Sequence, residues 1–322
     1  MASDGPPAAP TTTAVAALEG GALRYAEVER TADGRTSLRR LGTCDFDFDV
    51  GEAVLGVTGP SQLDTVAAAL REVFRSGGAR TLVVVAHPPA LVSFFSPLPE
   101  EMPAPARYEQ LRQEAALLAD VSTAQPVRIR AVPVRMETLP GPPERGGGPH
   151  RWHHVVHVAE PVHARLALLA RAVGSGTYDL VDATQAAAAA VHGLLAAGTP
   201  APRGAPGGAP FALAVGAYAA HAEFALCHDG AWHHGLHAPG GAPEDAAYFA
   251  LALLERLGVQ PEDVGRLFVY GDADADRHAV LAALLDRAPE PLDPLPLFGR
   301  RPDGVDPAEL AAFAPCLGAV LR

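Results

Sequence analysis

The sequence predicts an α/β protein built from two copies of one folding unit. Three closely spaced strand-like runs, a helix and a further apolar strand follow one another from Ala14, and the same order starts again at Phe211. Between the copies, the Pro- and Gly-rich segment 199–210 (TPAPRGAPGGAP) is typical of a linker. Hydrophobic residues form 48% and charged residues 19% of the chain, a globular and not a disordered composition.

The first copy follows residues 1–13, whose Pro-, Ala- and Thr-rich composition predicts a disordered tail. The second and third strands flank a Gly-containing turn, and the helix after them has apolar residues at spacing four and a Gly-Gly stop. The run TLVVVA is apolar throughout, which is typical of a strand at the centre of a sheet. The expected elements are strands at 14–18, 22–29 and 35–41, a helix at 62–75 and a strand at 81–86.

Additional sequence lengthens the first lobe, which we place at 14–198 with an inserted subdomain at about 88–157. Pro88–Pro103 is expected to be a proline-rich loop, and its adjacent Phe94 and Phe95 either anchor a core or dock a partner. The other expected elements are a helix at 108–118, a strand at 127–134, a loop at 141–148, a strand at 153–158, a helix at 161–173, a strand at 178–181 and an Ala-rich helix at 183–195.

The second lobe is placed at 211–322. Its apolar runs and turn residues repeat the pattern of the first copy. The expected elements are strands at 211–215, 222–227 and 231–237, a helix at 243–257, a strand at 267–270 and a helix at 276–287.

Composition excludes several classes of function. The chain has no lysine, so a phosphate-binding lysine, a Schiff base and a lysine general base are excluded. The net charge is −12 and the longest basic runs are Arg39-Arg40 and Arg300-Arg301, which predicts no nucleic-acid partner. Three scattered cysteines favour a reducing compartment. The first residues lack signal-peptide features and no apolar run is long enough to span a bilayer, so a cytoplasmic location is expected.

Five stretches of sequence resemble a known architecture. They are VVVAHPPALVSFFSPLPEE with the following YEQLRQEAALL, YDLVDATQAAAAAVHGLL, GAPEDAAYFALALLERLGVQPEDVGRLFVYGD and ELAAFAPCLGAVLR. Their order resembles the duplicated RNase H-like fold of actin-like ATPases, and more narrowly PilM-type pilus-assembly proteins and a Bacteroidota family of unknown function. The resemblance covers nearly the whole chain and implies two lobes with an inserted subdomain in the first.

In active members of that superfamily, two hairpin turns hold the phosphates of a nucleotide and a glycine turn holds its adenosine. Glycines let backbone N–H groups approach phosphate oxygens, and acidic residues hold the metal. The resemblance places six residues in these turns: Glu19, Gly20 and Gly21 in the first, Gly216 in the second, and Gly271 and Asp272 in the adenosine turn. Val215 stands where the second turn has an Asp, and neither phosphate turn contains Ser or Thr.

These departures predict a non-catalytic scaffold or adaptor, a pseudo-ATPase without a cofactor, because ATP hydrolysis needs charge neutralisation around the phosphates. The resemblance implies a protein partner, a single-span inner-membrane protein held in a groove of the first lobe, which would bring this cytoplasmic chain to the inner membrane. The alternative is an active ATPase or kinase that binds ATP and Mg in the interlobe cleft through Glu19, Asp182 or Asp272. Carboxylates converging on that cleft from both lobes would favour this alternative.

Histidines gather in two places, and a third possibility is an unrelated α/β enzyme that uses them. His150, His153, His154 and His157 lie in PHRWHHVVH; His221, His228, His233, His234 and His237 lie in the expected hairpins of the second lobe. Neither group has HExxH or paired cysteines, the spacings typical of zinc sites. We expect these histidines at exposed hairpin positions and predict no metal site.

Overall fold

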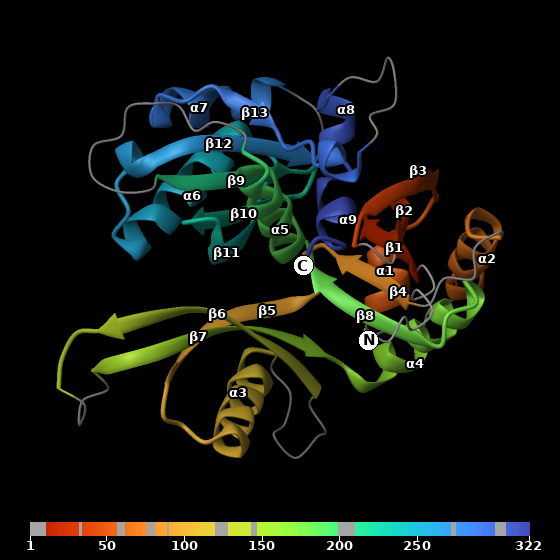
Figure 1. Cartoon of the computed structure of the whole chain (residues 1–322), viewed down its shortest axis with the longest axis horizontal. Helices are drawn as coiled ribbons and strands as arrows, with labels where there is room; N and C mark the ends of the chain where they lie inside the picture. The colour runs from red at the N-terminus through yellow and green to blue at the C-terminus, as the bar shows by residue number, and fades with distance from the viewer. Residues whose placement is uncertain are drawn as a thin grey trace, which may run out of the picture.

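The computed structural model describes residues 11–31, 34–56, 62–75, 81–88, 90–119, 128–142, 147–198, 210–271, 275–299 and 307–322. These residues form two five-stranded sheets and one three-stranded sheet (Figure 1). No described helix is both long enough and apolar enough to cross a bilayer.

The two large sheets repeat one topology, with strand orders β3-β2-β1-β4-β8 and β11-β10-β9-β12-β13. In the first sheet, β1 runs antiparallel to β2 and parallel to β4. In the second sheet, β9 runs antiparallel to β10 and parallel to β12 in the same way. The duplication predicted from the sequence is therefore confirmed. The strands are β1 (Thr11–Glu19), β2 (Ala22–Arg30), β3 (Thr36–Asp45), β4 (Thr81–Ala86), β8 (Thr177–Asp182), β9 (Phe211–Ala217), β10 (His221–His228), β11 (Ala231–Pro239), β12 (Val264–Gly271) and β13 (Pro289–Pro291).

Each large sheet is covered on both faces, which explains the continuous apolar sequences of β4 and β9. Helices α1, α2 and α4 pack on one face of the first sheet, and α6 and α7 on one face of the second. The other two faces turn toward each other, with α5 and α9 between them (Figure 1). The helices of both lobes are α1 (Val50–Leu55), α2 (Leu63–Val73), α4 (Glu160–Ala172), α5 (Ala183–Ala196), α6 (Pro243–Leu257), α7 (Ala279–Leu285), α8 (Pro307–Ala311) and α9 (Ala314–Gly318), with short 3₁₀ turns at Pro261–Asp263, Ala275–His278 and Leu295–Phe298.

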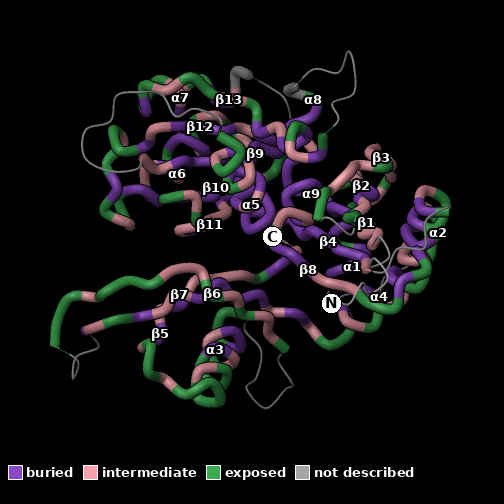
Figure 2. The backbone as a smooth tube through the Cα atoms, viewed as in Figure 1, coloured by how far each residue is buried: buried purple, intermediate pink, exposed green. Residues whose placement is uncertain are grey.

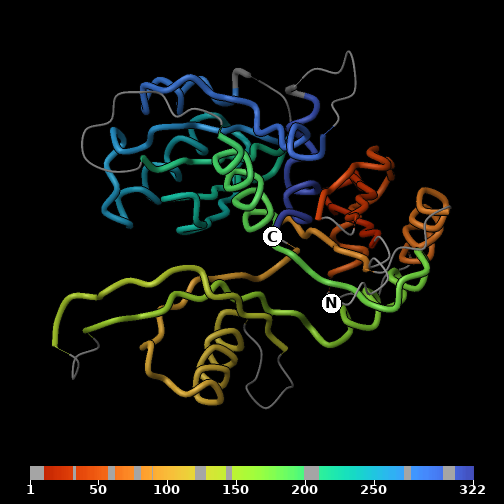
Figure 3. The backbone as a smooth tube through the Cα atoms, viewed as in Figure 1, coloured from red at the N-terminus to blue at the C-terminus, as the bar shows by residue number. Residues whose placement is uncertain are grey.

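The C-terminal segment crosses from the second sheet to the first. Leu295, Phe298 and Leu317 belong to the same apolar cluster as Val15 of β1. Figure 3 shows the blue C-terminal segment reaching the red and orange strands of the N-terminal lobe. We placed residues 211–322 in the second lobe, but the C-terminal end of this stretch packs on the first sheet. It covers an apolar face of that sheet.

The inserted subdomain is a small antiparallel sheet of order β5-β7-β6 with one helix against it. Its elements are β5 (Val92–Pro99), α3 (Ala104–Leu118), β6 (Arg128–Leu139) and β7 (Gly148–Val158). The prediction of a loop at Pro88–Pro103 was wrong over β5. Pro97 and Pro99 fit a strand here because β5 lies at the edge of the sheet, where a missing N–H breaks no ladder. Buried residues concentrate in the large sheets, α5 and α9, whereas the far end of the β6–β7 hairpin is exposed (Figure 2).

The predicted connecting segments fall partly outside the described residues. Residues 1–10 of the expected tail and 199–209 of the expected linker are among those that the structure does not describe. Thr11–Thr13 belong to β1, where they pair with β2, so the expectation that the tail extends to residue 13 was wrong.

Candidate functional site

The first of the predicted nucleotide turns joins β1 and β2. Gly20 has φ +50°, a left-handed conformation that the tight turn requires, and its carbonyl accepts a hydrogen bond from the Val50 N–H at 2.6 Å. The Glu19 carboxylate is neutralised within the hairpin by an ion pair with Arg24. A Cβ at Gly21 would lie 2.9 Å from a backbone carbonyl of the segment after β3. This turn is therefore closed by contacts within the first lobe.

Gly216 of the second turn lies between two larger residues. The strand register places it directly beside Glu223 on β10 and Tyr270 on β12, so all three residues share one face of the sheet. A Cβ on Gly216 would lie 2.5 Å from the Tyr270 ring. The ring crosses the glycine, and its hydroxyl donates to Glu223 Oε2 at 3.1 Å. Gly216 thus makes room for a tyrosine.

The adenosine turn is also filled by protein atoms. Gly271 has φ +89°, and a Cβ there would lie 2.6 Å from the carbonyl oxygen of Ala217 and 3.1 Å from the Tyr218 ring. Tyr218 is buried at 2% exposure. Asp272, the last of the predicted cofactor residues, lies outside the described residues.

A buried histidine and carboxylate cluster joins the lobes beside these turns. His87, which follows β4 of the first lobe, places Nδ1 2.8 Å from Oε1 of Glu223 in the second. His221 Nε2 lies 3.2 Å from the same oxygen. Burial opposes ionisation of Glu223, but the nearby histidines outweigh it and lower the pKa of this carboxyl; burial and Glu223 together raise the pKa of Tyr270.

Neither His87 nor Glu223 was among the predicted site residues. The sequence held one signal, a single acid in the otherwise apolar run AEFALC of a predicted strand. A charge at a buried strand position needs partners. Those partners come from a neighbouring strand and from the other lobe, and only the folded chain brings them together.

Asp182, an acid of the alternative ATPase hypothesis, is the N-cap of α5. Its carboxylate accepts from the Thr184 N–H at 2.7 Å and from the hydroxyls of Thr184 at 2.6 Å and Ser93 at 2.5 Å. Burial alone would raise the pKa of Asp182, but His154 at 3.5 Å and these donors hold it well below its usual range. Asp182 therefore links the inserted subdomain to the start of α5.

The nucleotide and Mg²⁺ that the resemblance implies do not fit these residues. A phosphate cradle needs glycine N–H groups facing open space and acids available to a metal. Glu19 and Asp182 both contact donors of the chain, and among the described turn glycines Gly20 alone has open space where a Cβ would stand. We therefore derive no chemical step through ATP.

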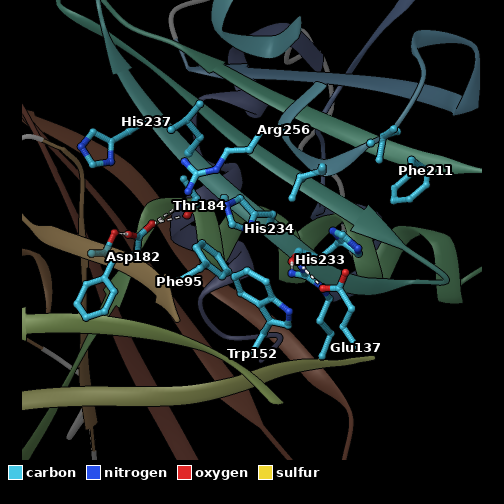
Figure 4. A pocket seen from close by; sticks show the side chains of 18 of the residues that line it. Phe95, Glu137, Trp152, Asp182, Thr184, Phe211, His233, His234, His237 and Arg256 are labelled. Carbon is cyan, nitrogen blue, oxygen red and sulfur yellow. Dashed lines mark hydrogen bonds and ion pairs between the residues drawn. The ribbon is translucent and has the colours of Figure 1, made fainter. Parts of the chain in front are cut away.

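A groove of about 800 Å³ lies elsewhere, between the inserted subdomain and the second lobe. Phe95 and Trp152 line it from the inserted sheet, and His234, Arg256 and Leu257 line it from β11 and α6. In Figure 4, Asp182, Thr184 and Arg256 mark one end of the groove, and Glu137, His233 and Phe211 mark the other.

The alternation of a strand separates the two phenylalanines that the sequence analysis singled out. Phe94 packs with Leu98 and Leu111 in the core of the inserted subdomain. Phe95 points the opposite way and stacks on His234, with ring centroids 4.1 Å apart. Phe94 is therefore a core anchor that also borders the groove, and Phe95 lines the groove at the contact with the second lobe.

Several histidines are buried and do not lie at the exposed positions that we expected. His150, His153, His154 and His234 are all less than 9% exposed, because the inserted sheet packs against β11 and α3. Burial and the nearby Arg135 lower the pKa of His233 to about 4 and that of His234 to about 3. Both are neutral at pH 7 and act as walls of the groove.

Charged side chains that line the groove include Arg135, Glu137 and Arg256. The Arg135 guanidinium lies 4.3 Å above the Trp152 ring, pairs with Glu137 at 3.0 Å and donates to the carbonyl of His233. Arg256 is exposed and makes no ion pair with any residue that the structure describes. Leu117 and Leu118 of α3 are 76% and 59% exposed beside the same groove. The groove thus combines an aromatic wall, apolar edges and an arginine that forms no ion pair with the described residues.

Comparisons with known proteins identify the fold. No protein-family model and no curated protein matches the sequence. A solved structure described as the PilM-PilN type IV pilus biogenesis complex contains a chain that superposes with TM-score 0.66 at 16% identity, over 98% of this chain and 99% of that one. A Bacteroides thetaiotaomicron protein of unknown function with an actin-like ATPase fold superposes with TM-score 0.51 at 9% identity, over 87% of this chain and 90% of that one.

These likenesses bear out the architecture predicted from the sequence. The two superpositions cover 98% and 87% of this chain, so the agreement in fold extends over most of its length. Together with the repeated sheet order, they show that the chain has the duplicated RNase H-like fold of actin-like proteins, similar to that of PilM.

Proposed function

We propose that this protein is a non-catalytic actin-like scaffold that works by binding a protein partner. The observation that carries the proposal is Tyr270 lying over Gly216, where a nucleotide-binding relative needs an open phosphate turn. The chain fills this position with a ring whose hydroxyl is held by a buried carboxylate. A phosphate could enter only by displacing the Tyr270 ring, and this would deprive the buried Glu223 carboxylate of one of its hydrogen-bond donors.

The partner-binding role rests on the groove between the inserted subdomain and the second lobe. An extended peptide of the partner lies there against Phe95 and Trp152, with an acidic side chain on Arg256. Exposed Leu117 and Leu118 extend the apolar surface beyond the cavity. The PilM-like structure was solved as a complex with PilN, which supports a protein ligand for this fold. In this proposal the partner is a single-span inner-membrane protein, which holds the cytoplasmic scaffold at the membrane.

Titration calorimetry with Mg·ATP tests the absence of nucleotide chemistry. We expect no heat of binding at micromolar protein and no release of phosphate above a buffer blank. The matched variant Tyr270→Phe keeps the ring over Gly216 and removes only the hydroxyl, so it should behave in the same way. Micromolar affinity for Mg·ATP accompanied by turnover would overturn the scaffold proposal in favour of an ATPase or kinase.

The groove is tested with Arg256→Glu. The probe is a fluorescent peptide from the cytoplasmic segment of a single-span membrane protein encoded next to this gene, measured by anisotropy. Reversing the charge places a carboxylate against the acidic peptide, and we expect at least about a tenfold loss of affinity. Arg71→Glu on α2 is the matched control, because Arg71 is also exposed and does not line the groove. Equal affinity of the two variants would exclude Arg256 from the interface.

A further inference from the structure

The histidine and carboxylate cluster between the lobes has the donors of a transition-metal site. His87 Nδ1, His221 Nε2 and Glu223 Oε1 all lie within 4.8 Å of one another. His221 and Glu223 are two residues apart on β10 and so share a face of the strand, whereas His87 enters from the end of β4. Two imidazoles and a carboxylate from two lobes thus converge on one point.

The charge of the cluster calls for a cation. The Glu223 side chain is fully buried. Within the described part of the chain it contacts no arginine; its ion-pair partners are His87 and His221. A buried carboxylate is strongly unfavourable without an opposite charge beside it. A divalent cation would supply that charge.

The residues around the three donors already hold them in place. Tyr270 donates to Glu223 Oε2, which leaves Oε1 directed at both histidines. Tyr218 stacks on the His221 ring with centroids 4.7 Å apart and meets the His87 ring edge-on at 5.1 Å. Such second contacts fix the orientation of metal ligands and raise affinity. The pair Gly216 and Tyr270 therefore supports the cluster as well as closing the phosphate turn.

We propose that His87, His221 and Glu223 bind one first-row transition-metal ion, Zn²⁺ being the expected ion, and that this ion ties the two lobes together. Imidazole nitrogen suits Zn²⁺ and its neighbours, whereas Mg²⁺ and Ca²⁺ prefer oxygen ligands throughout. Each imidazole binds through the nitrogen that now faces Glu223, with its proton on the other ring nitrogen. The proposal departs from our expectation of no metal site and is independent of the proposed partner.

Metal analysis of the whole chain tests this site directly. Protein freed of metal with a chelator is equilibrated with Zn²⁺, and the bound metal is counted by mass spectrometry. We expect one Zn²⁺ per chain, a rise of the thermal midpoint on loading, and visible absorption bands of four-coordinate Co²⁺ when cobalt replaces zinc. Less than half an equivalent of Zn²⁺ on wild-type protein would overturn the proposal without any variant.

The variants separate this site from the other histidines, of which the chain has 13 in all. His221→Gln and His87→Gln should each weaken Zn²⁺ binding by at least about tenfold and remove the cobalt bands. His228→Gln is the matched control, since it lies at the other end of β10, outside the cluster. Metal binding that survives in His87→Gln but not in His221→Gln would contradict a site shared between the lobes. Equal loss in the control would mean adventitious binding.

Discussion

Replacing Gly318 by alanine is expected to lower the free energy of unfolding by about 3 kcal/mol or more, because the new methyl group has no space. A Cβ at this position would lie 2.0 Å from the carbonyl oxygen of Ala186 on α5 and 3.2 Å from the Ala190 side chain. The carbonyl belongs to a helix backbone and cannot turn aside. The clash can be relieved only if α9 moves away from α5.

Moving α9 also disturbs the first sheet, which enlarges the effect. Cys316 and Leu317 of α9 are fully buried and belong to the apolar cluster that includes Val15. The cost of Gly318→Ala therefore includes lost packing in both lobes.

Urea unfolding followed by circular dichroism measures the loss caused by Gly318→Ala. Gly176→Ala is the matched control, because no heavy atom lies within 4 Å of a Cβ there and its φ is not positive. We expect the control to remain within about 0.5 kcal/mol of wild type. If the two variants are equally stable, α9 is not packed on α5 as the structure has it. Faster proteolysis of the C-terminal segment in Gly318→Ala would show that α9 detaches locally before the lobes unfold.

The sequence was sufficient for the fold where local pattern and burial agree. The run TLVVVA is buried on both faces as β4, and the Ala-rich run after Asp182 is a helix that fits between two sheets. The pattern failed at β5 and β13, whose prolines argue against strands. Both are edge strands, where proline breaks no ladder, but edge position depends on topology and cannot be read from the local sequence.

The candidate site was less predictable, because it depends on register and on contact between lobes. Gly216 was predicted as a phosphate-turn glycine. Its cross-strand neighbours are Glu223 and Tyr270, and the Tyr270 ring fills the space beside it. A shift of one residue in either strand would move Glu223 or Tyr270 to the other face. The buried histidines were misjudged for a related reason, since hairpin residues are exposed unless another subdomain packs on them, as the inserted sheet does on His234.

Replacing Asp182 by asparagine is expected to destabilise the protein by about 2–4 kcal/mol at pH 7. The carboxylate is 2% exposed and accepts bonds from Ser93 of the inserted subdomain and from two groups of Thr184. An amide has one acceptor oxygen in place of two and brings its own donors into a site that already holds donors. The variant loses the cap of α5 and the link to β5 together.

The effect of Asp182→Asn should depend on pH in a defined direction. The pKa of Asp182 lies well below its ordinary value of 3.8 in the folded protein, because His154 and the surrounding donors outweigh the effect of burial. A carboxylate whose folded pKa is lowered stabilises the fold above the unfolded pKa, and this contribution is lost as pH falls toward the folded value. The difference between wild type and variant should therefore be constant from pH 7 to about 5 and shrink below about 4.

Urea midpoints at pH 7, 5 and 4 measure this difference, and comparing the two proteins at each pH cancels the titration of the other groups. Asp179→Asn on the same strand is the control. Asp179 pairs with Arg130 at 3.4 Å and Arg322 at 2.8 Å but is one-third exposed, so its loss should cost less than about 1 kcal/mol. A variant as stable as this control would mean that the bonds around Asp182 do not join the inserted subdomain to α5. A difference that grows on acidification would contradict the lowered pKa, since protonation must make the wild-type side chain more like the amide.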